Sequence, residues 1–398
     1  MRKSLGERAD VAVVGGGVAG LAAARELARR GLSVSVIEDG RAGSASRAAA
    51  GMLAPQAEAD GADELFELLC ASRDLYPDFA AALGEESGIE VEVERTGTLY
   101  LALDEEDEEE VERRFAWQSR AGLEVERLTA AEARAVEPNV SPSVRLALRF
   151  PRDWQVESRR LTAALGGAAE RSGVRFVRAV EALGVRVRQG RAAGVVTSEG
   201  ELEAGAVLFA AGAWFSRLKK FVGADIETLD DDPRVGPVRG QILCFRQTRG
   251  QAPLFRHVVY GPRGYVVPRR EGRLLAGSTT EPGLYECRVT EEGARSIAAR
   301  AAELAPAVGA LEVEDSWAGL RPRASDGLPV LGESADVPGL FYATGFYRNG
   351  ILLAPAAGEI VADLLTSRAT RLSPSVLKTF SPARFYQPAA PPQVLAPR

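Results

Sequence analysis

Near the start of the 398-residue chain stands Val13-Val14-Gly15-Gly16-Gly17-Val18-Ala19-Gly20, which contains the pattern G-x-G-x-x-G. The apolar run Ala9–Val14 predicts a buried strand before the glycines. Residues 18–30 have helical spacing, with apolar side chains on one face and charged side chains on the other. A second apolar run, 33–37, follows and ends at Glu38. The order of strand, glycine turn, helix and strand predicts a dinucleotide-binding β-α-β unit.

Each glycine of the pattern has a physical role in such a unit. Gly15 permits the tight turn, Gly17 lets the backbone approach a pyrophosphate, and Gly20 lets the helix pack closely on the strand. Glu38 can accept hydrogen bonds from a ribose hydroxyl and would repel a 2′-phosphate, which argues against NADP. A glycine turn with a purely structural role is the less favoured alternative. The pattern alone does not distinguish NAD from FAD.

Later segments favour FAD, the longer cofactor. Two further apolar runs end in glycine turns, at Gly212 and Gly345. The second turn leads through 346–350 into an apolar helical pattern. The N-terminus of that helix could face the far end of the cofactor and stabilise negative charge on a reduced flavin ring. A strand–helix crossover without ligand contact remains the alternative.

The middle of the chain has a different pattern. Residues 184–207 predict three short strands in a meander, and 239–280 alternate as in an antiparallel sheet. We therefore expect an α/β (α+β) fold, in which a Rossmann-like FAD-binding domain is interrupted by an antiparallel β-sheet substrate domain with helices. The predicted boundaries are 1–85, 145–218 and 320–386 for the FAD-binding domain, 86–144 and 219–319 for the substrate domain, and 387–398 for a loose tail.

Composition excludes several other classes of protein. The net charge of −6 gives no general attraction for nucleic acid or anionic membrane. His257 is the single histidine, and Cys70, Cys244 and Cys287 lack metal-ligand spacing, so no metal site is expected. The acidic run 104–112 is interpreted as a solvated loop entering a helix. Without a targeting segment or a long apolar run, the expected location is the cytoplasm.

Several segments of the chain resemble the D-amino acid oxidase family of flavoproteins, and within it the glycine oxidases of the bacterial thiamine pathway. The resembling segments are 13–20, Ala48-Ala49-Ala50-Gly51-Met52-Leu53-Ala54-Pro55, Gly264-Tyr265-Val266-Val267-Pro268-Arg269, Trp317-Ala318-Gly319-Leu320-Arg321-Pro322, Asp326-Gly327-Leu328-Pro329 and Arg348-Asn349-Gly350-Ile351-Leu352-Leu353-Ala354-Pro355. They occur in the family's order over nearly the whole chain.

The resemblance implies non-covalent FAD and the oxidative deamination of glycine or a related small amine by molecular oxygen. The products would be an oxo acid, ammonia and hydrogen peroxide, and the protein could be a homo-oligomer. Together with the glycine turns, the implied cofactor contacts are Gly15, Gly17, Val18, Ala19, Gly20, Glu38, Asp39, Ala45, Ser46, Ala50, Gly51, Met52, Val180, Gly212, Phe346, Tyr347, Arg348, Asn349, Gly350, Ile351 and Leu352.

Three residues match the family's catalytic positions. Arg321 would bind the substrate carboxylate in a bidentate pair, Tyr265 would bond the same carboxylate, and Arg348 would lie close to the flavin. Each residue also has a structural alternative. Arg321 could be a surface arginine at a strand end, Tyr265 an ordinary tyrosine of a sheet, and Arg348 a solvent-facing arginine in a turn. Trp317 and Gly319 share the strand face of Arg321, so Trp317 is expected to wall the substrate pocket.

The sequence departs from the family's pattern at three places. Phe346 and Arg263 stand where the family can have histidine, and Thr280 lies near a position that can be apolar. These departures leave the substrate open between glycine, sarcosine and larger D-amino acids. An electron acceptor other than oxygen also remains an alternative.

Overall fold

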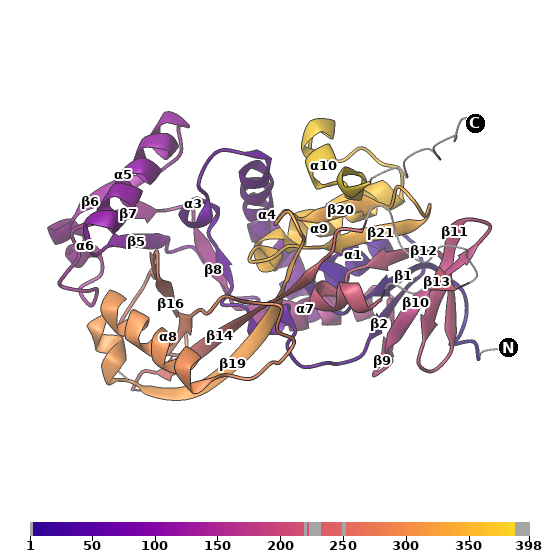
Figure 1. The fold of residues 1–398 in the computed structure, drawn as a ribbon, viewed down its shortest axis with the longest axis horizontal. Helices are drawn as coiled ribbons and strands as arrows, with labels where there is room; N and C mark the ends of the chain where they lie inside the picture. The colour runs from indigo at the N-terminus through magenta and orange to yellow at the C-terminus, as the bar shows by residue number, and fades with distance from the viewer. Residues whose placement is uncertain (1–2, 219–220, 223–231, 249–251, 387–398) are drawn as a thin grey trace, which may run out of the picture.

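The structure, a computed structural model, describes residues 3–218, 221–222, 232–248 and 252–386. The predicted tail at 387–398 lies outside the described residues. Two large sheets with helices packed around them make up the molecule, and they lie at opposite ends of the view in Figure 1. A three-stranded sheet made of β3 (Met52–Leu53), β8 (Trp154–Val156) and β4 (Val93–Glu94) completes the described strands.

The first sheet has a parallel centre. Its parallel strands run in the order β9 (Arg175–Arg178), β2 (Val34–Glu38), β1 (Ala9–Val14), β12 (Glu201–Phe209) and β21 (Leu340–Thr344). Helix α1 (Val18–Arg29) connects β1 to β2. The predicted unit of strand, glycine turn, helix and strand is therefore confirmed.

A meander and a hairpin extend this sheet. β10 (Ala182–Arg188), β11 (Arg191–Thr197) and β12 pair antiparallel, as predicted. Gln189 and Gly190, between β10 and β11, both have positive φ, as the tight turns of hairpins require. β13 (Phe221–Val222) pairs with β10, and β20 (Val330–Glu333) pairs with β21.

The second sheet is mostly antiparallel, as predicted, and includes one parallel pair. Its strands are β5 (Thr98–Ala102), β6 (Glu126–Thr129), β7 (Leu146–Phe150), β14 (Gly236–Arg246), β15 (Val258–Gly261), β16 (Gly264–Pro268), β17 (Arg273–Gly277), β18 (Glu281–Pro282) and β19 (Glu312–Arg323). β15 runs parallel to β5, and β7 lies between β5 and β6. β7 thus pairs within the second sheet, although the predicted boundary at residue 145 grouped it with the first.

The remaining elements cover the sheets. They are α2 (Ala45–Ala48), α3 (Pro55–Glu58), α4 (Glu64–Ser87), α5 (Glu105–Arg120), α6 (Ala130–Val136), α7 (Ser158–Arg171), α8 (Glu291–Leu304), α9 (Gly350–Leu365), α10 (Pro374–Phe380), η1 (Gly212–Arg217), η2 (Pro306–Ala310) and η3 (Pro382–Phe385). The acidic run 104–112 supplies the N-cap and first turns of α5, where negative charge stabilises a helix. In the described part of the chain, no helix combines the length and apolar character needed to cross a membrane.

Helix α9 is held against α4 at the point where a proline interrupts its hydrogen bonding. Pro355 has no N–H, so the carbonyl of Ile351 lacks its usual partner within the helix. The buried hydroxyl of Tyr76 donates to that carbonyl instead. Ser72 Oγ, also buried, donates a 2.7 Å hydrogen bond to the carbonyl of Leu352. Two side chains of α4 therefore fix the first turns of α9 in place.

Candidate active site

A cavity of about 680 Å³ lies between the two large sheets and is lined by residues of both. One group of lining residues surrounds the glycine turn after β1. A second group contains Tyr260, Tyr265, Arg321 and Arg348, which come from the second sheet and from the loop before α9. The cavity therefore joins the predicted nucleotide site to the predicted catalytic residues.

The glycine turn has no room for larger side chains. A Cβ atom on Gly15, whose φ is +115°, would lie 2.3 Å from the carbonyl oxygen of Ala210. A Cβ on Gly16 would lie 2.1 Å from the carboxylate of Glu38. Gly20 does not line the cavity; its Cβ would lie 2.1 Å from the carbonyl oxygen of Gly15, which is the close helix–strand packing that the sequence predicted.

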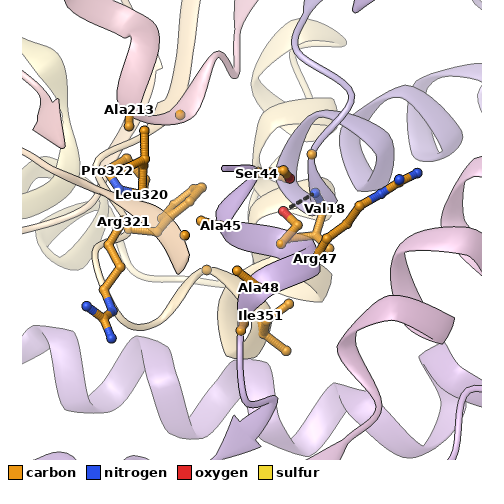
Figure 2. A pocket seen from close by; sticks show the side chains of 18 of the residues that line it. Val18, Ser44, Ala45, Arg47, Ala48, Ala213, Leu320, Arg321, Pro322 and Ile351 are labelled. Carbon is orange, nitrogen blue, oxygen red and sulfur yellow. Dashed lines mark hydrogen bonds between the residues drawn. The ribbon is translucent and has the colours of Figure 1, made fainter. Parts of the chain in front are cut away.

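Two helix N-termini open into this cavity. The N-cap residues, Gly17 for α1 and Asn349 for α9, give no side-chain capping hydrogen bond in the described structure. The N–H of Val18 donates to a group outside the helix, Ser46 Oγ, at 3.0 Å (dashed in Figure 2). Uncapped N–H groups and aligned peptide dipoles favour anions such as a pyrophosphate or a reduced flavin. Together with the glycine turn and Glu38, they fit an FAD molecule.

The loop through Ala50, Gly51 and Met52 is supported from behind by a buried cation. Arg269 donates to the carbonyl of Ala50, and it also donates to the carbonyl of Val156 at 3.2 Å. Gly51 has φ +77°, and a Cβ there would lie 2.0 Å from the same Val156 oxygen. Burial lowers the pKa of Arg269 to about 10, which leaves it protonated at neutral pH. The loop is therefore fixed in a shape that only glycine permits.

The prediction that Trp317 walls the substrate pocket is wrong. Trp317 does not line the cavity; its Nε1 donates a 2.9 Å hydrogen bond to the carbonyl of Ala48, and Arg159 stacks on its ring. Gly319 does line the cavity, and a Cβ there would lie 2.4 Å from Cβ of Ala48. Trp317 and Gly319 of β19 thus pack against α2. Arg321, two residues after Gly319 on the same strand, lines the cavity.

Arg321 projects into the cavity from β19. Figure 2 shows its side chain extending away from Leu320 and Pro322. Its Nη2 donates to Ser278 Oγ at 2.6 Å and its Nη1 to the carbonyl of Thr279 at 3.1 Å. The guanidinium has five N–H donors, so it retains free donors for a ligand.

Tyr265 lies at the end of a stack of aromatic rings. Its ring stacks on Tyr260 at 6.3 Å, and Tyr260 stacks on Tyr100 at 5.4 Å between ring centres. Burial raises the pKa of Tyr265, so its hydroxyl stays protonated and able to donate. Arg348 Nη2 approaches Thr280 Oγ1 at 3.3 Å.

The sequence reasoning missed Glu58, which also lines the cavity. One sequence signal could have identified it. Pro55, two residues after the segment Ala50-Gly51-Met52-Leu53, favours the start of a helical turn, and Glu58 ends that turn. Burial raises the pKa of Glu58, and the guanidinium groups of Arg348, Arg321 and Arg114 act in the opposite direction.

The cavity brings together all the residues that were predicted to contact cofactor or substrate except Gly20 and Trp317. Those from the first sheet, from its connecting segments and from α2 and β3 are Gly15, Gly17, Val18, Ala19, Glu38, Asp39, Ala45, Ser46, Ala50, Gly51, Met52, Val180 and Gly212. Those from the second sheet, the loop before α9 and the first turn of α9 are Tyr265, Arg321, Phe346, Tyr347, Arg348, Asn349, Gly350, Ile351 and Leu352. Their individual roles stay predictions. No group of three or more His, Cys, Asp or Glu residues suited to a metal ion occurs within the described ranges.

The chain is similar to known proteins both in sequence and in structure. The chain is 39% identical over 368 residues to a glycine oxidase of Geobacillus kaustophilus, covering 91% of this chain and 94% of that protein. The crystal structure of glycine oxidase from Geobacillus kaustophilus superimposes with a TM-score of 0.88 at 38% identity, covering 95% and 99% of the two chains. The structure of iminodiacetate oxidase from Chelativorans sp. BNC1 does so with a TM-score of 0.82 at 28% identity, covering 94% and 98%.

The sequence profile of the family described as FAD dependent oxidoreductase matches residues 10–364. This match spans the glycine turn, both large sheets and α9, and the resemblance to glycine oxidases is confirmed by the relatives above. The cavity and its two helix N-termini fit the cofactor that gives the family its description. The chain therefore belongs to the FAD dependent oxidoreductase family.

Proposed function

We propose that this protein is an FAD-dependent oxidase of glycine or a closely related small amine. The observation that carries the proposal is that Arg321 and Tyr265 line the same cavity as the glycine turn and the N-terminus of α9. One cavity can therefore hold a flavin nucleotide and, beside its ring, the carboxylate of an amino acid. The glycine oxidase relatives, similar over most of the chain, support this choice of substrate.

The chain's own residues bind and orient the substrate. The fork of Arg321 can pair with both oxygens of an α-carboxylate, and the protonated hydroxyl of Tyr265 can donate to the same group. This pairing would hold Cα–H in one direction, and orientation is the main catalytic contribution available here. When bound, FAD supplies the two-electron oxidant for the Cα–H bond. The N-terminus of α9 would stabilise negative charge at the far end of the cavity.

The overall reaction consumes glycine, oxygen and water and yields the oxo acid, ammonia and hydrogen peroxide. The purified protein should be yellow, and glycine should bleach the flavin absorbance without oxygen. Readmission of air should restore the colour and release peroxide. A protein that contains FAD but keeps its absorbance with glycine, sarcosine and D-amino acids would contradict the proposal.

A second candidate substrate is a secondary amine such as sarcosine or iminodiacetate, which the likeness to an iminodiacetate oxidase favours. A substrate panel read by peroxide release ranks these amines against glycine and the larger D-amino acids. Activity with a dye but not with oxygen would instead identify a dehydrogenase. The cytoplasmic location, the supply of thiamine synthesis and a homo-oligomeric state stay predictions from the sequence.

A further inference from the structure

Among the charges that act on the cavity-lining carboxylate of Glu58 are those of Arg348 and Arg321, and the proposed chemistry has not used this carboxylate. Glu58 is the last residue of α3 and lines the cavity with Tyr260, Tyr265, Arg321 and Arg348. The other acidic residues that line the cavity in the described structure, Glu38, Asp39 and Glu181, come from the ends of β2 and β9 near the glycine turn. Glu58 is therefore the acidic partner available where a substrate carboxylate would meet Arg321.

The backbone on both sides of Glu58 is anchored. Before it, the buried carboxylate of Asp153 accepts hydrogen bonds from the N–H of Gln56 at 3.2 Å and of Ala57 at 2.7 Å. After it, the guanidinium of Arg114 donates to the carbonyl of Ala59. Glu58 thus stands on a short turn with fixed ends, which is the support that a ligand-binding side chain needs.

The carboxylate of Glu58 itself has no hydrogen-bond or ion-pair partner among the residues that the structure describes. Arg114 is engaged by Glu110 at 2.7 Å and Asp60 at 3.2 Å. Arg321 is bonded to Ser278 and Thr279. A partly buried carboxylate without a partner carries a desolvation cost that a cationic group in the cavity would offset.

The charges around Glu58 come from several elements and do not replace such a cation. Arg348, Arg321 and Arg114 lower the pKa of Glu58 through space, whereas burial raises it. The carboxylates of Asp153 and Glu58 repel each other, since the charge of Glu58 raises the pKa of Asp153. Tyr260 and Tyr265 line the same cavity, and burial raises the pKa of both hydroxyls and keeps them neutral.

We propose that Glu58 receives the ammonium group of the substrate while Arg321 receives the carboxylate. The inference rests on the proposed function, and it explains why the substrate would be an amino acid rather than another small acid. Two charged anchors of opposite sign recognise an amino acid zwitterion, whereas a carboxylic or hydroxy acid satisfies only Arg321. A secondary amine such as sarcosine keeps N–H donors when protonated and so remains acceptable to Glu58.

The test separates recognition of the amine from recognition of the carboxylate. Glycine is titrated anaerobically against flavin reduction, and acetate, which has no amine, is titrated against the shift of flavin absorbance. In Glu58→Gln the apparent Kd for glycine should rise about tenfold or more, because a charged hydrogen bond is lost. Acetate should bind as tightly as to the wild type, or more tightly, because a negative charge near it has gone. Glu291→Gln, an exposed position on α8, is the matched control and should change neither value.

Two results would overturn the inference. One is an unchanged Kd for glycine in Glu58→Gln. The other is a parallel loss of glycine and acetate, which is the result expected of a merely structural carboxylate. If Glu58→Gln fails to fold or to bind FAD, Glu58→Asp keeps the charge and shortens the side chain, and it should weaken glycine binding while leaving acetate binding intact. A wild-type protein that binds acetate but is not reduced by glycine would instead reject the proposed function.

Discussion

The guanidinium of Arg321 lies flat on the backbone of Gly240, on the neighbouring strand β14. A Cβ atom at position 240 would fall 2.3 Å from Cζ of Arg321, so no other residue type leaves the guanidinium in this place. The register of β14 and β19 pairs Gly240 with Gly319, and Arg321 follows two residues later. The position of the predicted carboxylate anchor therefore depends on a glycine of another strand.

We expect Gly240→Ala to displace this guanidinium without unfolding the protein. The KM for glycine should rise about tenfold, because a misplaced anchor loses the orientation of the reacting bond. The measurement is steady-state peroxide release. Gly236→Ala, on the same strand with open space around its Cβ, is the control and should retain wild-type kinetics. Equal kinetics for the two variants would argue against this role of Gly240.

Removal of the Arg321 side chain should have a larger effect. We expect Arg321→Ala to raise KM for glycine about a hundredfold, since a bidentate charged pair is lost. Arg321→Lys keeps the charge but loses the planar fork, so its KM should lie between those of the wild type and Arg321→Ala. Arg295→Ala, at an exposed site on α8, serves as the control. Unchanged kinetics for Arg321→Ala would refute its role as the carboxylate anchor.

The bonds from α4 to α9 predict a loss of stability. Tyr76→Phe leaves the buried carbonyl of Ile351 without a partner, which should lower the free energy of unfolding by about 1–3 kcal/mol. Urea denaturation measures this change, and FAD release at lower urea should accompany it, because the same turn lines the cavity. Tyr386→Phe, at an exposed position, should leave both unchanged. Stability equal to that of the wild type in Tyr76→Phe would show that water or another group satisfies the carbonyl.

Asp153 predicts a pH dependence of stability. Burial raises its pKa from 3.8 to about 7, against the two backbone hydrogen bonds that it accepts. The native state therefore holds a proton that the unfolded state releases, and stability should fall as pH rises from about 4 to 7. The difference in unfolding free energy between the wild type and Asp153→Asn should change over this window. A difference that is constant with pH, as expected for the exposed control Asp78→Asn, would contradict the raised pKa.

The glycine turn could be predicted from sequence because its signals are local. Gly15, Gly17 and Gly20 stand at fixed distances between an apolar strand and an amphipathic helix. Gly15 has φ +115°, and a Cβ on Gly20 would lie 2.1 Å from the carbonyl oxygen of Gly15. The position of Glu38 is also a local signal, because it ends the next strand, β2. The start of α8 has a local signal of the same kind, because the hydroxyl of its N-cap residue Thr290 accepts from Gly293 N.

Partners that are distant in sequence could not be predicted in this way. The apolar run of β7 indicates a strand but not that β5 and β6 flank it, because a buried strand is apolar whichever sheet contains it. Trp317 was placed on the correct face of β19, but its partner Ala48 lies far away in the sequence. Glu58 was missed because its importance arises from Arg321 and Arg348, which only folding brings near it.

The walls of the cavity come from both ends of the polypeptide. The α1 turn begins at Val18, whereas the α9 turn begins at Gly350, and the Tyr76 hydroxyl that secures α9 lies early in the chain. During synthesis on the ribosome, the α1 side of the cavity is therefore complete long before the residues of α9 have been added. We expect the cofactor to be acquired only after nearly complete synthesis, and fragments lacking the final helices to emerge colourless.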